Sequence, residues 1–207
     1  GPLYRQPENK TNFFDWLITD FNAVANIFEN LSFKDDNFIK KDKFTFDNIN
    51  GQSNKMHGGW NRVYRKVEHK DFKMISLHDV KKELNEIPND FIDKYKRRFD
   101  RLYQKCVENK SIHFVHCLDF QWLNAYIPTK DNIRLFFEAI KIINPILITK
   151  LYFLIPPKYN KPENKNVFEE INSIDNVEVF YLEDKGFRDD WKSGNLTFDK
   201  FFMKLKI

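Results

Sequence analysis

The stretch FKMISLHDVKKE, residues 72–83, places His78 and Asp79 where an apolar, strand-like run gives way to charged residues. A histidine is the side chain best suited to proton transfer near neutral pH, so His78 is a candidate general base or phosphate contact. Asp79 is a candidate base or metal ligand. Adjacent residues of an extended chain point to opposite sides, so the two side chains are not expected to pair with each other. The alternative is an ordinary strand end, with Asp79 as a turn or capping residue.

Acidic residues also follow two later strand-like runs. Asp119 comes directly after one of them, and Glu183 and Asp184 come after the other. In open parallel α/β sheets, ligands bind outside the carboxyl ends of the strands. We therefore expect Asp119 or Glu183, on a neighbouring strand, to partner His78, and the acids to act as a base or as metal ligands. An ordinary turn or cap is again the alternative.

The most concentrated positive charge lies in KYKRRFDR, residues 94–101. On a helix, Arg97 and Arg101 are four residues apart, and together with Arg98 they could hold a diphosphate or a carboxylate. The planar guanidinium fork matches either group. The alternative is a solvated helix face on which nearby acids form ion pairs.

The segment KMHGGWNR, residues 55–62, gathers two of the six glycines between His57 and Trp60. An aromatic side chain beside flexible backbone could stack on a sugar or a base. A hairpin turn anchored by Trp60 is the alternative, so the sequence leaves this segment open.

The two cysteines, Cys106 and Cys117, are too few for a disulfide framework. A nucleophilic cysteine needs a histidine within hydrogen-bond reach. Cys117 and His116 are neighbours on a predicted strand and therefore face opposite sides. We expect both cysteines to lie in the core. The five histidines show no metal-ligand spacing such as HExxH, so the sequence predicts no metal site formed by histidines.

The elements that must position these residues alternate between strand and helix. The expected strands are residues 72–77, 112–118, 150–155 and 177–182. Apolar stripes at helical spacing lie between and after them: Phe91, Tyr95, Phe99, Leu102 and Cys106; Ile133, Phe136, Phe137, Ile140 and Ile143; Val167, Phe168 and Ile171; and Phe198, Phe201, Phe202 and Leu205. This alternation predicts parallel strands joined by helical crossovers. We expect a Rossmann-like layered α/β fold, with a mainly parallel sheet of four to five strands and helices on both faces.

An N-terminal helix is predicted from the spacing of Leu17, Phe21, Val24, Phe28 and Leu31, capped by Asp20 or Thr19. We expect one α/β domain over residues 1–207, with a helical and irregular cap region in residues 1–70 and repeated β-α units in residues 71–207. The chain opens with Gly-Pro and no Met, which indicates a cleavage scar or a fragment of a larger protein.

The composition excludes several classes of protein. The chain of 207 residues carries 34 basic and 30 acidic residues, a balance that is not typical of a nucleic-acid binder. No apolar run approaches the ~18–20 residues needed to span a bilayer. The low cysteine content favours a reducing, cytoplasmic location. The bias toward Lys, Asn, Ile and Phe indicates an AT-rich coding genome, such as a viral one. The GxGxxG and GxxxxGK[ST] signatures are absent.

Three segments together resemble a protein family. They are TNFFDWLITDFNAVANIFEN (residues 11–30), SLHDV (residues 76–80) and KYKRRFDRLYQ (residues 94–104), followed by the strand IHFVHC. Their order and spacing over residues 11–120 resemble a family described as papain-like cysteine peptidases, a domain of unknown function. The resemblance implies that His78 is the family's histidine and that a nucleophilic cysteine precedes FFDW, where this chain has none. It also implies an association with surface polysaccharides.

Three functions remain open from the sequence. The first is a glycosyltransferase-like enzyme that binds a nucleotide sugar and a glycan acceptor at the carboxyl ends of the strands, with Mn²⁺ or Mg²⁺ as a possible metal. The second is a cysteine hydrolase or acyltransferase, as the family resemblance implies. The third is a non-catalytic binding domain within a larger protein. We expect the first.

Overall fold

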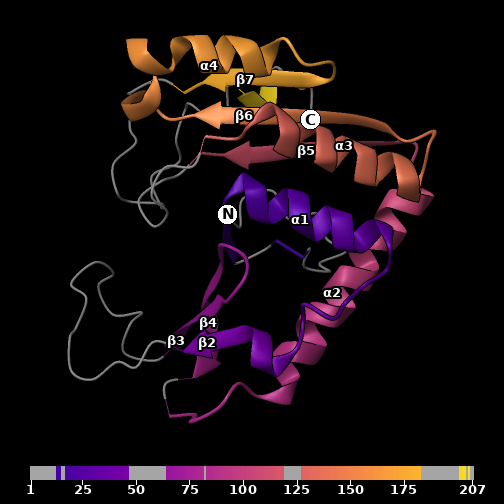
Figure 1. The fold of residues 1–207 in the computed structure, drawn as a ribbon, viewed down its shortest axis with the longest axis vertical. Helices are drawn as coiled ribbons and strands as arrows, with labels where there is room; N and C mark the ends of the chain where they lie inside the picture. The colour runs from indigo at the N-terminus through magenta and orange to yellow at the C-terminus, as the bar shows by residue number, and fades with distance from the viewer. Residues whose placement is uncertain are drawn as a thin grey trace. The chain divides into compact units, whose positions relative to one another are not determined.

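The structure is a computed structural model, and it describes residues 13–14, 17–46, 64–81, 83–118, 127–182, 201–203 and 205. The chain divides into two compact units. Unit 1 comprises residues 1–109 and 132–147, and unit 2 comprises residues 110–131 and 148–207. Each unit holds one sheet of described strands (Figure 1).

Unit 1 is built on a four-stranded antiparallel sheet in the order β1-β4-β3-β2. Its strands are β1 (Leu17–Thr19), β2 (Phe44–Phe46), β3 (Tyr64–His69) and β4 (Met74–Lys81). β3 and β4 form a hairpin whose connection is residues 70–73. A connection this short joins only antiparallel strands, because parallel neighbours need a crossover of about a dozen residues or more.

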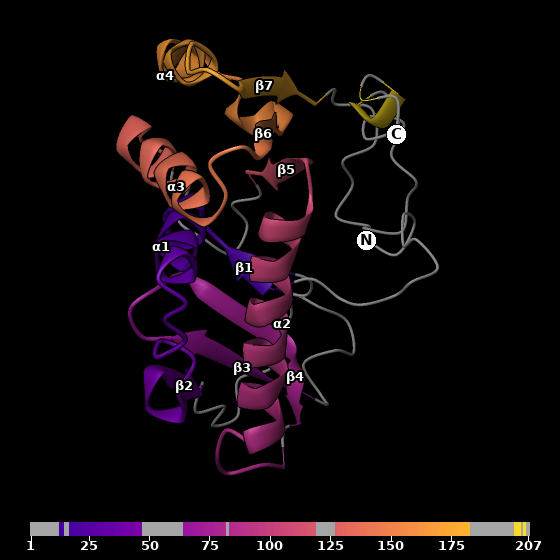
Figure 2. The ribbon, with the colours of Figure 1, turned by 90° about the vertical axis from the view of Figure 1, so that its right-hand side faces the viewer.

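Unit 1 also contains three helices: α1 (Phe21–Ser32), α2 (Asn89–Glu108) and most of α3 (Lys130–Ile143). A 3-10 turn, η2 (Lys41–Lys43), precedes β2. The carboxylate of Asp20 accepts the backbone N–H of Ala23 at 2.7 Å, so the predicted N-cap is confirmed. α2 runs across one face of β3 and β4 (Figure 2), and side chains of α2 and β4 are hydrogen-bonded.

Aromatic packing forms the core of unit 1. The ring of Phe136 on α3 lies 4.7 Å from Phe28 and 5.6 Å from Phe21, both on α1. The predicted apolar stripe of α2 is buried at each of its positions: Phe91, Tyr95, Phe99, Leu102 and Cys106. Burying one large apolar side chain contributes about 1.5–3 kcal/mol, so this stripe fixes the face that α2 turns toward the core.

Unit 2 is built on a three-stranded parallel sheet in the order β5-β6-β7. Its strands are β5 (Ser111–Cys117), β6 (Ile148–Ile155) and β7 (Val177–Tyr181), and η4 (Pro157–Tyr159) and α4 (Pro162–Asn172) connect β6 to β7. Tyr152 and Leu154 of β6 form a buried cluster with Leu182 and Phe201. On the opposite face, Phe168 of α4 packs against Tyr181 at 6.2 Å.

The predicted mixed α/β class is confirmed, and three of the four expected strands form a parallel sheet. The fourth, residues 72–77, is present as part of β4, but it lies in the antiparallel sheet of unit 1. The prediction of a parallel sheet of four to five strands is therefore not confirmed by the described residues. The prediction counted residues 72–77 as the first parallel strand of a β-α series. It did so because β3, the antiparallel hairpin partner of β4, was not recognised in the sequence.

Neither unit has a described helix that combines the length and hydropathy needed to cross a bilayer.

The expected boundary at residue 70, between the cap region and the repeated β-α units, lies between β3 and β4 and therefore inside unit 1.

Candidate functional site

The β3–β4 hairpin contains a bulge at the position of His78 and Asp79. Arg65 lies opposite Val80 and Val67 lies opposite Ser76, so one residue of β3 faces three residues of β4, 77–79. β4 therefore carries two extra residues. Bulges bend a strand, redirect side chains and occur frequently next to active sites. His78 and Asp79 lie within β4 and not beyond its carboxyl end, which corrects the expectation from the sequence.

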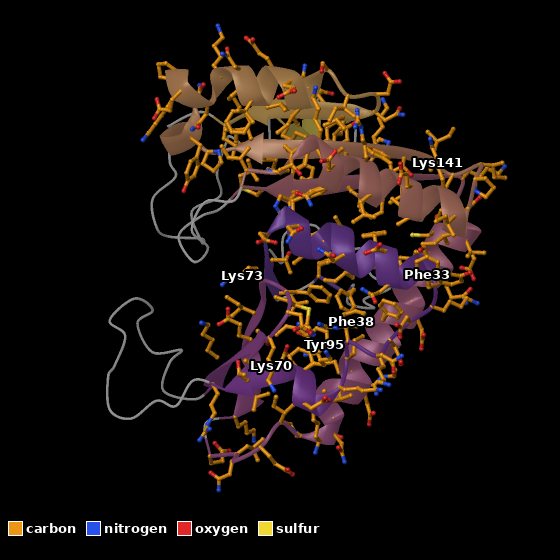
Figure 3. All side chains as sticks on the ribbon, in the orientation of Figure 1. Phe33, Phe38, Lys70, Lys73, Tyr95 and Lys141 are labelled. Carbon is orange, nitrogen blue, oxygen red and sulfur yellow. The ribbon has the colours of Figure 1, made fainter. Side chains whose placement is uncertain are left out.

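The bulge directs the Asp79 carboxylate into a polar cluster. It accepts the hydroxyl of Ser76 at 2.7 Å, the ammonium of Lys94 and the hydroxyl of Tyr95. On a regular strand, residues three apart face opposite sides, so Ser76 and Asp79 could not meet without the bulge. Lys94 and Tyr95 come from the second turn of α2, and Tyr95 is labelled among the side chains of unit 1 in Figure 3. We call Ser76, Asp79, Lys94 and Tyr95 the bulge cluster.

Burial and charge fix the protonation states of the bulge cluster. The Asp79 side chain is 7% exposed. Burial raises the pKa of Asp79, but the hydrogen bonds from Lys94, Tyr95 and Ser76 outweigh it, and the pKa is lowered overall. Burial and the Asp79 charge raise the pKa of Tyr95, so its hydroxyl stays a donor. Asp79 is thus a carboxylate that already accepts from three donors. This is the environment of a positioning group more than of a proton acceptor.

The three arginines of the basic run do not share one face of α2. Arg97 is exposed, Arg101 is partly buried, and Arg98 is 2% exposed with its guanidinium carbon 5.2 Å from the centre of the Tyr95 ring. Arg98 follows Tyr95 by three residues, so it shares the core-facing side of the helix. It is therefore absent from the solvated face predicted for this run. The binding of one anion by Arg97, Arg98 and Arg101 together stays a prediction. The orientation of Arg98 toward the core and of Arg97 toward solvent does not favour it.

Several predicted site residues lie outside the described part of the chain. They are His57, Trp60, Asp119, Glu183 and Asp184, together with the side chain of His78. Asp119 follows the last residue of β5 by two positions, and Glu183 follows the last residue of β7 by two. β4 belongs to a different sheet. The expectation that Asp119 or Glu183 reaches His78 from a neighbouring strand of the same sheet is therefore wrong.

The two cysteines have different surroundings. Cys106 is fully buried on α2, and burial raises the pKa of its thiol to about 11. Such a thiol is an inert core residue, as predicted. Cys117 is partly buried and packs against the Tyr152–Phe201 cluster of unit 2.

The sequence did not reveal three members of the bulge cluster, Ser76, Lys94 and Tyr95, as partners of Asp79. Tyr95 was assigned to the core and Lys94 to a charged surface run, and each of these assignments describes part of its surroundings. Nor did it single out His69, which is buried and hydrogen-bonded at both ring nitrogens. The sequence feature that pointed to the bulge cluster was the polar pair His78-Asp79 next to an apolar strand-like run.

Comparison of the chain with protein-family models, with curated proteins and with solved structures found no match. Within the described ranges, no group of three or more His, Cys, Asp or Glu side chains is arranged to hold a metal ion. Asp119, Glu183 and Asp184 fall outside those ranges.

Proposed function

We propose that the chain is a glycosyltransferase-like domain that binds a nucleotide sugar at the carboxyl edge of the β5-β6-β7 sheet. The observation that carries this proposal is the strand arrangement of unit 2. Three consecutive strands run parallel and lie side by side in chain order, with α3 and α4 in the two connections. This β-α-β-α-β order along the chain, in which most of α3 belongs to unit 1, is that of the mononucleotide-binding half of doubly wound folds, whose ligands lie outside the carboxyl ends of the strands.

The acidic residues that follow these strands support the proposal of an anionic ligand that is bound through a metal ion. Asp119 follows β5, and Glu183 and Asp184 follow β7. β5 and β7 flank β6, so the two strand ends are about 10 Å apart at the usual strand spacing. Carboxylates are the protein ligands that hold Mg²⁺ or Mn²⁺ together with the phosphates of a substrate, so these acids are the proposed metal ligands. Within unit 2 the proposal depends on these acids and not on His78 or Arg97, which belong to unit 1.

The cysteine hydrolase is the weaker alternative. It requires a thiol that ionises readily next to a histidine. The pKa of Cys106 is raised to about 11, and Cys117 packs in the apolar cluster of unit 2. The raised pKa of Cys106 is the opposite of what a nucleophilic thiol needs, and this supports the transferase over the hydrolase.

A binding and turnover experiment tests the proposal. Purified chain is titrated with UDP, GDP and their sugar conjugates, with and without Mn²⁺ or Mg²⁺, and the melting temperature and the release of nucleoside diphosphate are followed. A ligand at 100 times its Kd stabilises the folded state by about 2.7 kcal/mol. Asp119→Asn and Glu183→Gln should abolish the shift and the release.

The matched control is Asp175→Asn, because Asp175 is exposed and precedes β7 at the amino edge of the same sheet. This variant should bind like the unmodified chain. Absence of a shift with each nucleotide would refute the nucleotide site. Binding without release of nucleoside diphosphate would support the non-catalytic binding domain in place of the transferase.

A further inference from the structure

We propose that Asp79 is a positioning residue: its bonds to Ser76, Lys94 and Tyr95 lock the register of the β3–β4 hairpin and so fix the place of His78. This inference rests on unit 1 alone and does not depend on the nucleotide site. It assigns the bulge cluster a role that the apolar pattern of the hairpin cannot perform.

The hairpin uses two pairing registers at once. In the first part, Val67 pairs with Ser76 and Glu68 with Ile75; in the second part, Arg65 pairs with Val80 and Tyr64 with Lys81. The two registers differ by two residues, which is the extra length of β4. Continuing the first register without a bulge would place His78 opposite Arg65.

The apolar pattern does not choose between these registers. Side chains alternate with a period of two, so a slip of two residues leaves each side chain on its original face. Val67 and Val80 lie on one face of the hairpin and Ile75 lies on the other, and each, at most 3% exposed, would stay on its own face after such a slip. The burial of apolar groups therefore contributes little to the free-energy difference between the bulged hairpin and the slipped one.

The described pairs with the neighbouring strand β1 stop short of the bulge. Among residues 17–19, the pairs with β4 are at Met74, Ile75 and Ser76, and the last of them is Leu17 with Ser76. From residue 77 onward, the described contacts of β4 are with β3 and α2. The described residues of β1 thus fix the start of β4, and the bulge begins directly after the last of these pairs.

The bulge cluster supplies the missing restraint. A slip of two residues moves Asp79 along the strand by about 6.6 Å, which is more than a hydrogen bond can span. The buried carboxylate would leave the ammonium of Lys94 and the hydroxyl of Tyr95, both held on the rigid helix α2. Bonds of this charge-assisted kind are about twice as strong as neutral ones. The carboxylate therefore selects the bulged register, and the backbone of His78 stays within the bulge.

The register is read directly by NMR. In the unmodified chain we expect a cross-strand contact between the backbones of Arg65 and Val80. In Asp79→Ala we expect this contact to be replaced by one between Arg65 and His78, with a changed chemical shift and pH midpoint of the His78 imidazole. The control is Asp71→Asn, which breaks the exposed Lys43–Asp71 pair of the same hairpin and should leave the register unchanged.

A second variant covers the case in which Asp79→Ala does not fold. Tyr95→Phe removes one donor and keeps the ring; we expect amide exchange at Arg65 and Val80 to rise about tenfold or more relative to exchange at Glu68 and Ile75. A purely structural cluster would raise exchange by the same factor at all four amides, and that result would overturn the proposal. So would an Asp79→Ala variant that keeps the Arg65–Val80 contact and the native titration of His78.

Discussion

Acid is expected to destabilise unit 1 through His69. Its Nε2 lies 2.9 Å from the carbonyl oxygen of Phe38, and its Nδ1 accepts the backbone N–H groups of Asp71 and Phe72 at 3.1 and 3.2 Å. Since Nδ1 is an acceptor, the proton of the neutral ring is on Nε2 and is donated to Phe38. A second proton would occupy Nδ1 and remove both accepted bonds. Burial accordingly lowers the pKa of His69.

The sign of the pH effect follows from this lowered pKa. In the unfolded chain a histidine titrates near pH ~6.5, whereas folded His69 binds its proton only at lower pH. Between the two pKa values the unfolded state binds more protons, so stability rises with pH there. The contribution of His69 is complete above pH ~6.5 and is lost progressively below it. Two neutral hydrogen bonds at about 0.5–1.5 kcal/mol each set the scale of the loss, and proton linkage limits it to about 2 kcal/mol at pH ~5, because each pH unit below ~6.5 is worth at most about 1.4 kcal/mol.

Urea unfolding at about pH 7.5 and about pH 5 measures this loss in the unmodified chain and in His69→Gln. Glutamine can still donate to the Phe38 carbonyl but does not titrate, so the variant should be less stable at the higher pH and show a smaller pH dependence. His113→Gln is the control, because His113 is exposed and should leave the pH dependence intact. Equal stability of the unmodified chain at the two pH values would refute the reasoning, as would a His69→Gln variant with the full pH dependence.

Three further predictions concern packing, capping and thiol reactivity. Phe136→Ala should reduce the free energy of unfolding by about 3–5 kcal/mol in urea titrations, whereas Phe33→Ala, at a position 70% exposed, should change it by less than about 0.5 kcal/mol; equal effects would contradict the packing described here. Asp20→Ala should lower the thermal midpoint, because loss of an N-cap costs about 0.5–2 kcal/mol; an unchanged midpoint would show that the cap is dispensable. Cys106, with a pKa raised to about 11, should react with iodoacetamide only in denaturant, as followed by mass spectrometry, and rapid native labelling would contradict its burial.

The sequence predicted well what depends on local pattern. Asp20 was expected as a cap because its short carboxylate can reach a backbone N–H of the first turn, and the structure places it there. Phe91 and Cys106 were expected on one helix face because spacing alone determines which side chains share a face. Leu17 was wrongly counted in the first helical stripe: it precedes the cap at Asp20 and lies in β1.

The sequence could not predict what depends on pairing. Whether β4 runs parallel or antiparallel to its neighbour is decided by β3, whose residues YRKVEH alternate too weakly in hydropathy to mark a strand. The meeting of Ser76 with Asp79 depends on a bulge, and a period of two predicts that these side chains point apart. Their contact with Tyr95 depends on how α2 crosses the sheet. The polar pair His78-Asp79 was identified from the sequence as a candidate site and stays a prediction, but the strand that carries it was assigned to the wrong sheet.

The two units are interleaved along the chain, and this has a consequence for synthesis and for dissection of the protein. Phe136, which packs on Phe21 and Phe28, is encoded after β5, the first strand of unit 2. At about 5–20 residues per second, the ribosome takes on the order of ten seconds to add the residues between Phe21 and Phe136. During this time α1 emerges without the Phe136 ring that packs on Phe21 and Phe28 in the folded unit. For the same reason, no single cut in the chain releases either unit whole, and a truncation near residue 110 should yield an aggregation-prone fragment.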